Sequence, residues 1–192
     1  MKLDEIEKAC DILNNGGIVI FPTDTAFGVG CRIDNVKSIE RLFEIRKRPE
    51  SQATPVLFNS IKMVEDYLLP IQPDVYPLMK THWPGALTIV LPCKLDKVPS
   101  LVRGGGTNLG VRIPDHEIPL ELIRRINTPI LGPSANFHGA NTPFSYSDID
   151  PAFIELVDFS LTGETKDEKN VSTIIDCSTR PWKVLRKGMV IV

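Results

Sequence analysis

The sequence lacks any long apolar segment. None of its apolar runs, in 192 residues, approaches the length of about 18–20 residues that a membrane-spanning helix needs. Its first residues, MKLDEIEKACDIL, mix acidic with apolar side chains and lack the uninterrupted apolar stretch of a secretion signal. We therefore expect a cytoplasmic protein with no membrane partner.

Paired cysteines are also missing. The four cysteines, Cys10, Cys31, Cys93 and Cys177, are scattered and form no C-x-x-C pair. This spacing argues against a zinc site and against a disulfide scaffold. We expect no metal bound by protein side chains, and we expect thiols that are buried or neutral, as free cysteines usually are.

The chain has no excess of basic charge. Its net charge is −2 and its pI is about 5.9, whereas a protein that wraps nucleic acid over a broad surface is normally basic. Any contact with a nucleic acid or a nucleotide must therefore use a local basic patch.

The order of predicted elements indicates the fold class. No repeat, low-complexity segment or Gly/Ser linker divides the chain, so residues 1–192 are expected to form one domain. Helical spacing of apolar residues predicts helices, with Ser60 and Asp115 as caps, over 3–13, 36–48, 60–68, 115–126 and 151–157. Short apolar runs predict strands within 17–22, 55–59, 86–92, 108–114 and 128–136, and strands or turns within 158–163, 172–177 and 182–188. The pattern predicts an α/β domain around a mixed sheet.

A basic run, EIRKRP, ends the second predicted helix. Arg46 follows Leu42 by four residues and Phe43 by three, which places it on the apolar side of the helix. Arg48 lies where Pro49 forces the helix to stop, and Lys47 points away. The pattern fits a solvated helix end with long, snorkelling side chains, and it also fits a cleft in which Arg46 and Arg48 grip an anion.

Two glycine-containing stretches could lie close to a ligand. FPTDTAFGVG places Thr23 and Thr25 where a strand becomes a loop, and RGGGTN at 103–108 puts three glycines between strands. Each fits an ordinary turn as well as a loop whose backbone N–H groups meet phosphate. Neither has the dinucleotide or P-loop spacing.

A third stretch, GPSANFHGANTP, follows a buried strand. It places Ser134 and Asn136 at the end of that strand, where α/β sheets usually bind ligands. A hydrolase that uses Ser134 with His82, His116 or His138 is one alternative, although the G-x-S-x-G pattern is absent.

Taken together, seven ordered blocks resemble the YrdC-like family of threonylcarbamoyl-adenylate synthases, over roughly residues 4–190. The blocks are GGIVIFPTDTAFGVG, IRKRP, HWPGALTIVLP, LGVRIPDH, PILGPSANFHG, STIIDC and LRKG. The resemblance implies a twisted mixed sheet with surrounding helices and a concave basic cleft. It also implies synthesis of L-threonylcarbamoyl-AMP and pyrophosphate from L-threonine, bicarbonate and ATP with Mg²⁺. The intermediate would pass to a threonylcarbamoyl transferase complex that modifies ANN-decoding tRNAs, and some members also bind tRNA or double-stranded RNA.

The resemblance also implies roles for individual residues. Arg46 and Arg48 match the basic K-x-R positions, which are expected to contact the triphosphate and to carry the catalytic charge stabilisation. Positions that match the nucleotide site are Arg48, Gln52, Asn108, Ser134, Asn136, Thr142 and Arg186. Positions that match the threonine site are Thr23, Thr25, Leu57, Arg112 and Ser172, with Arg112 holding the carboxylate.

Two positions depart from the family pattern. Arg46 stands where lysine is common, and Gly132 stands where many members carry a larger side chain before S-A-N. Two alternatives to the synthase stay open at this stage. One is an RNA-binding module of the same fold without catalysis. The other is a related carbamoyl-adenylate activity, although its known forms carry zinc-type cysteine pairs and an acylphosphatase motif, which this sequence lacks.

Overall fold

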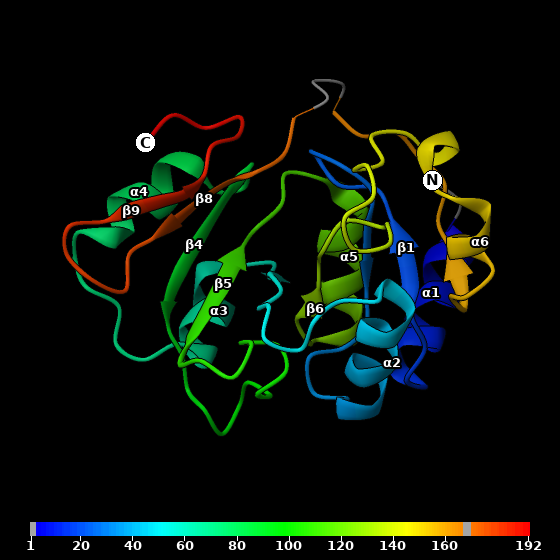
Figure 1. Ribbon diagram of the computed structural model, residues 1–192, viewed down its shortest axis with the longest axis horizontal. Coiled ribbons are helices and arrows are strands. Elements are labelled where there is room, and N and C mark those ends of the chain that lie inside the picture. The colour runs from blue at the N-terminus through cyan, green and yellow to red at the C-terminus, as the bar shows by residue number, and fades with distance from the viewer. Residues whose placement is uncertain (1–2, 167–169) are drawn as a thin grey trace.

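The strands form two hydrogen-bonded mixed sheets in the computed structural model, which describes residues 3–166 and 170–192. One sheet has the order β6-β3-β5-β4-β8-β9 and the other has the order β2-β1-β7. The strands are β1 Val19–Phe21, β2 Gly28–Gly30, β3 Val56–Leu57, β4 Leu87–Pro92, β5 Asn108–Arg112, β6 Ile130–Leu131, β7 Phe159–Ser160, β8 Thr173–Asp176 and β9 Lys183–Arg186. Figure 1 shows β4, β5, β8 and β9 in one half of the molecule and β1 in the other.

The predicted α/β class is confirmed, and the sheet arrangement adds a detail that the sequence did not reveal. Parallel pairs (β3 with β5, β4 with β8, β1 with β7) alternate with antiparallel ones. The two sheets meet where β2 lies against β6, through the isolated bridges Gly28–Ser134 and Arg32–Ile130. A Cβ at Gly30 would lie 2.0 Å from the carbonyl oxygen of Leu131, so glycine permits this close approach.

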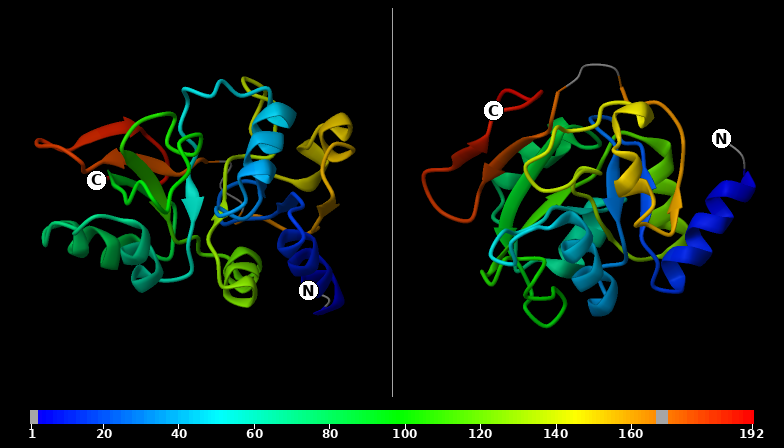
Figure 2. Two further views of the ribbon diagram at one scale, coloured as in Figure 1. Left: turned by 90° about the horizontal axis from the view of Figure 1, so that it is seen from below. Right: turned by 45° about the vertical axis from the view of Figure 1, so that its right-hand side comes forward.

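The helices cover the sheets from several sides. They are α1 Leu3–Asn14, α2 Val36–Arg46, α3 Ile61–Tyr67, α4 Val75–His82, α5 Glu117–Ile126 and α6 Pro151–Ile154, with a 3-10 turn at Tyr146–Asp148. Figure 2 shows α1 and α5 side by side in both views, where Leu13 and Leu122 belong to one buried apolar cluster. A larger cluster fills the core around β4 and β5. No helix of the described residues is long and apolar enough to cross a membrane.

Most predicted elements are confirmed, and three details differ. Helix α4 was not predicted, because Pro77 in its first turn obscures the helical pattern although proline is tolerated there. Strand β2 forms within a stretch that was expected to be a turn. The cap of α5 is His116, whose Nδ1 accepts from the amide of Ile118 at 3.2 Å; Asp115 instead pairs with Lys166. All four cysteines are buried and free, as expected.

Helix α2 is important for function because its last turn carries the basic run. Asn35 caps its start, with Oδ1 accepting from the amide of Ser38 at 3.1 Å. Its end lies before the predicted stop: Lys47 takes a left-handed conformation, with φ at 51°. The amide of Arg48 then donates to the carbonyl of Phe43 at 3.0 Å, which is the hydrogen bond that closes a Schellman motif. Arg48 precedes Pro49, and a residue before proline avoids helical angles. The helix therefore ends before Arg48, with the left-handed residue at Lys47.

Replacing Asn35 with Ala should lower the free energy of unfolding by about 1 kcal/mol, because the amide of Ser38 loses its capping acceptor. Urea denaturation measures the change. Asn35→Ser keeps an oxygen at the cap and should recover most of the loss. A Ser variant as unstable as the Ala variant would contradict a capping role.

Candidate active site

A cavity of about 180 Å³ lies between the two sheets. Its walls come from the turn after β1, the end of α2, β3, β4, β5, the segment after β6, and β8 and β9. Four arginines face it: Arg46, Arg48, Arg112 and Arg186. The cavity is therefore built from segments far apart in the sequence, and it gathers positive charge.

Arg46 is buried in the cavity wall, with 4% of its surface exposed. Its Nε donates to the backbone oxygen of Asn136 at 3.2 Å, and its Nη2 lies 3.3 Å from the side-chain oxygen Oδ1 of Asn136. Its Nη1 is buried without a hydrogen-bond partner. Burial, with the nearby charge of Arg48, lowers the pKa of Arg46 to about 10. Arg46 thus keeps an unsatisfied donor in a cavity that suits an anion.

Arg48 is half-buried and is held by carbonyl oxygens. Its Nε donates to Gln52 O at 3.1 Å and its Nη2 to Ala53 O at 2.5 Å, and burial lowers its pKa. Lys47 is exposed and lies over the ring of Phe137 instead, 5.0 Å from the centroid. The basic run is therefore divided as one of its two interpretations predicted, with Arg46 and Arg48 at the cavity and Lys47 outside.

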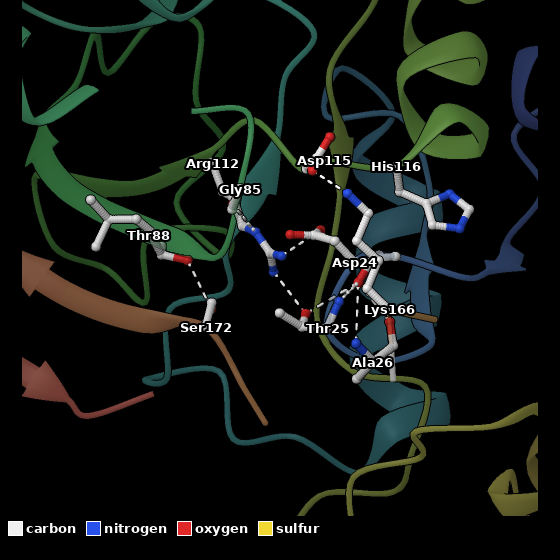
Figure 3. Close-up of polar contacts among 12 residues, drawn as sticks. Asp24, Thr25, Ala26, Gly85, Thr88, Arg112, Asp115, His116, Lys166 and Ser172 are labelled. Carbon is white, nitrogen blue, oxygen red and sulfur yellow. Dashed lines mark hydrogen bonds and ion pairs between the residues drawn. The ribbon is translucent and has the colours of Figure 1, made fainter. Parts of the chain in front are cut away.

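The turn after β1 is folded around Thr23. Its Oγ1 accepts from the amides of Thr25 at 3.1 Å and Ala26 at 3.2 Å, and it donates to Ala26 O at 2.7 Å. These local bonds explain why threonine, whose hydroxyl can close such a turn, stands here. The turn directs Asp24 and Thr25 toward Arg112 (Figure 3).

Arg112, at the end of β5, is fixed by three acceptors. Its Nη2 lies 2.6 Å from Asp24 Oδ1, its Nη1 donates to Thr25 Oγ1 at 3.0 Å, and its Nε donates to Gly85 O at 2.9 Å. Figure 3 shows the guanidinium between these groups. Because a guanidinium carries five N–H bonds, two remain for a ligand.

A second polar group lies on β4, β8 and β9. Arg186 donates from Nη2 to Ser172 Oγ at 2.8 Å and from Nε to Ser172 O at 3.0 Å. Ser172 Oγ is also 3.1 Å from Thr88 Oγ1. Arg186 is exposed at the cavity rim, yet loss of hydration at its guanidinium and the charge of Arg112 lower its pKa. Because one of the two hydroxyl protons is used in the Ser172–Thr88 bond, whichever hydroxyl donates, the pair keeps one proton to donate to a ligand.

The segment after β6 is braced internally. Ser134 Oγ donates to Asn136 Oδ1 at 2.7 Å, and Asn136 Nδ2 donates to Ala140 O at 2.7 Å and Asn141 O at 3.1 Å. Within residues 3–166 and 170–192, no hydrogen bond joins Ser134 to a histidine, so the geometry does not assemble the hydrolase alternative.

The structure brings together most of the residues that the sequence singled out. Those that line the cavity are Thr23, Thr25, Arg46, Arg48, Leu57, Arg112, Ser134, Thr142, Ser172 and Arg186. Gln52, Asn108 and Asn136 are not in the lining; Gln52 offers its carbonyl to Arg48, and Asn136 supports Arg46 and Ser134. Their predicted contacts with the nucleotide stay predictions.

Two further residues of this region were missed at the sequence level. Thr88, within the otherwise apolar strand β4, lines the cavity. Asp24 is not part of the lining, but it forms an ion pair with Arg112, which is. The strand pattern around Thr88 gives no sign of its polar contact. Asp24 lies in the quoted PTDT stretch, but its partner is 88 residues away.

Comparison with known proteins identifies the family. Residues 11–188 match the Sua5/YciO/YrdC family, described as "Telomere recombination". Proteins named threonylcarbamoyl-AMP synthase are 34% identical over 188 residues in Bacillus subtilis (96% of this chain, 53% of that protein) and 29% identical over 188 residues in Photobacterium profundum (97% and 100%). The structure of Pyrococcus abyssi Sua5 complexed with L-threonine superposes with a TM-score of 0.89 at 32% identity, over 95% of this chain and 54% of that one.

The chain thus spans about half the length of the Bacillus and Pyrococcus relatives and the whole of the Photobacterium one. The family match covers most of the chain, and the fold agrees with it. The protein belongs to the Sua5/YciO/YrdC family.

Proposed function

We propose that this protein is a threonylcarbamoyl-AMP synthase, a nucleotidyltransferase that forms L-threonylcarbamoyl-AMP and pyrophosphate from L-threonine, bicarbonate and ATP. The observation that carries the proposal is the unbalanced positive charge of the cavity. Among the described residues, Arg46, Arg48 and Arg186 have no carboxylate partner. A triphosphate supplies the negative charge that such a cavity needs. Relatives named for this activity, at 29–34% identity, support the choice of reaction.

The amino-acid end of the site would use Arg112 and the hydroxyls around it. Arg112 has two free N–H bonds, and the Ser172–Thr88 pair has one free hydroxyl proton. All of these groups are donors, so they suit a carboxylate. Leu57 and the small residue Gly132 would form the wall beside the threonine side chain. The Pyrococcus Sua5 structure with L-threonine supports a threonine site in this fold.

The reaction needs no covalent enzyme intermediate. The threonine amine and bicarbonate give a carbamate, losing water. A carbamate oxygen then forms a bond to the α-phosphorus of ATP while the bond to pyrophosphate breaks. Arg46 and Arg48 would hold the triphosphate and stabilise the charge that develops on the leaving group.

Mg²⁺ would accompany ATP in this proposal. The described residues contain no cluster of three or more His, Cys, Asp or Glu side chains that could hold a metal ion. The ion would therefore be bound by phosphate oxygens and water, which is common for Mg²⁺. Transfer of the product to tRNA by a downstream complex, direct contact with tRNA or double-stranded RNA, and a cytoplasmic location stay predictions.

The direct test is release of pyrophosphate by the purified protein with Mg²⁺, ATP, bicarbonate and L-threonine. We expect release that requires threonine and bicarbonate, and formation of threonylcarbamoyl-AMP in equal amount by mass spectrometry. Omission of threonine is the control for ATP hydrolysis. If omission leaves the rate unchanged, the proposed function is wrong.

Replacing Arg46 with Met should show separately how the buried charge of Arg46 affects the stability of the protein and how it affects ATP binding. The unliganded variant should be as stable as the wild type or more stable by about 1 kcal/mol, because an unpaired buried charge is replaced by an apolar chain. Its affinity for ATP should fall by at least about tenfold, since a charge-assisted contact is lost. Thermal denaturation and calorimetry measure the two effects, with the exposed Arg124→Met as control. A variant that keeps wild-type ATP affinity would remove the role of Arg46.

Replacing Gly132 with Ala should narrow the part of the cavity that is proposed to bind threonine, without changing the part proposed to bind ATP. The new Cβ would lie 2.4 Å from Leu57 Cγ, so the Leu57 side chain must shift, and the packed core on its other side directs it into the cavity. We expect threonine affinity to fall by about tenfold while ATP affinity is kept. Adding Leu57→Val should restore room and recover threonine binding. Equal loss of both affinities, or no loss of threonine affinity, would contradict this arrangement.

A further inference from the structure

The four arginines of the cavity form two sides of unequal charge. Arg46 and Arg48 lie close enough for the charge of one to lower the pKa of the other, and they come from the end of α2. Arg112 and Arg186, on β5 and β9, are related in the same way. Both sides would carry +2 if no carboxylate lay nearby.

Asp24 makes the two sides different. It is the one carboxylate that bonds to any of these arginines in the described part of the chain, at 2.6 Å from Arg112 Nη2. The Arg112 side therefore carries a net charge of +1, because Asp24 cancels one of its two positive charges, and the Arg46 side keeps +2. The first matches a single carboxylate, and the second matches a polyphosphate.

Asp24 is placed to act through Arg112 and not on a ligand. Its exposed fraction is 4%, and it is absent from the cavity lining although Thr23 and Thr25 on either side line it. The turn around Thr23 Oγ1 fixes its direction. In Figure 3, Asp24 and Thr25 approach the guanidinium of Arg112 from the same turn. A buried charge in this position costs desolvation, and ion pairing with Arg112 offsets that cost.

We infer that Asp24 determines specificity at the Arg112 side, by lowering its charge so that this side takes a carboxylate and leaves polyphosphate to Arg46 and Arg48. Arg186, which the family resemblance matched to the nucleotide site, is thereby assigned to the side that takes the carboxylate. The assignment of the two ends to threonine and ATP rests on the proposed function. Without Asp24, four guanidinium charges would compete for the same triphosphate. A nucleotide bound across both sides would occupy the place of the amino acid, and no carbamate could reach the α-phosphorus.

The test uses inorganic tripolyphosphate, which needs no turnover. Calorimetry should show that Asp24→Asn binds tripolyphosphate about tenfold more tightly than wild type, because a nearby negative charge has been removed. Asp24→Asn with Arg112→Gln removes both charges and should return the affinity to the wild-type value. Asp34→Asn, which breaks the exposed pair with Arg32 at 2.7 Å, is the matched control and should change nothing. Unchanged or weaker binding by Asp24→Asn overturns the inference.

A second measurement follows threonine binding in the presence of tripolyphosphate. Its result for the wild-type protein does not depend on how the variant folds. Threonine affinity should be the same with and without saturating tripolyphosphate, since the polyanion stays on the Arg46 side. In Asp24→Asn, tripolyphosphate should compete with threonine. Competition in the wild type overturns the inference. A charge effect of Asp24 on tripolyphosphate together with no threonine-dependent pyrophosphate release would overturn the proposed function and leave the role of Asp24 as a charge regulator.

Discussion

The arrangement of the cavity depends on one electrostatic constraint: several guanidinium groups are held close together with little negative charge to balance them. Backbone carbonyls, an asparagine and a serine hold Arg46, Arg48 and Arg186 in position. These neutral oxygens orient the fork of each side chain without cancelling its charge. Repulsion among the guanidinium groups thus destabilises the unliganded protein, and an anionic ligand relieves that repulsion when it binds.

Arg46 occupies the first basic position of the run, where the resemblance to the family led us to expect lysine. Its planar fork reaches both the backbone oxygen and the side-chain oxygen of Asn136 while Nη1 remains unpaired. A lysine ammonium also has three N–H donors, but they radiate from one nitrogen, so it lacks the planar fork that spans the two oxygens of Asn136. The internal bonds of Asn136 to Arg46, Ser134 and the loop that follows belong to the same arrangement.

Local rules predicted much of this site, and contacts over long sequence distances account for what they missed. The helical period alone placed Arg46 on the inner side of α2 and Lys47 outside, because a helix repeats within a few residues. The strand ends before Thr25 and Ser134 were likewise visible as apolar runs that stop at polar residues, whereas Arg112 was singled out only by the resemblance to the family. The partners of Asp24 and Thr88 lie 88 and 84 residues away, so no local pattern reveals them. The predicted cap of α5 was wrong for a related reason. Asp115 forms an ion pair with Lys166, which is distant in the sequence, and the adjacent His116 caps the helix instead.

The distribution of cavity residues along the chain has a consequence for folding. The lining extends from Thr23 to Arg186, and its walls belong to both sheets. The contacts that build the cavity join residues far apart in the sequence, so no fragment that ends before β9 contains the whole site. A ligand that bridges its walls would bind only the completed native state. It would therefore raise the stability of the whole fold by mass action, and the folded fraction of the protein would rise with substrate concentration.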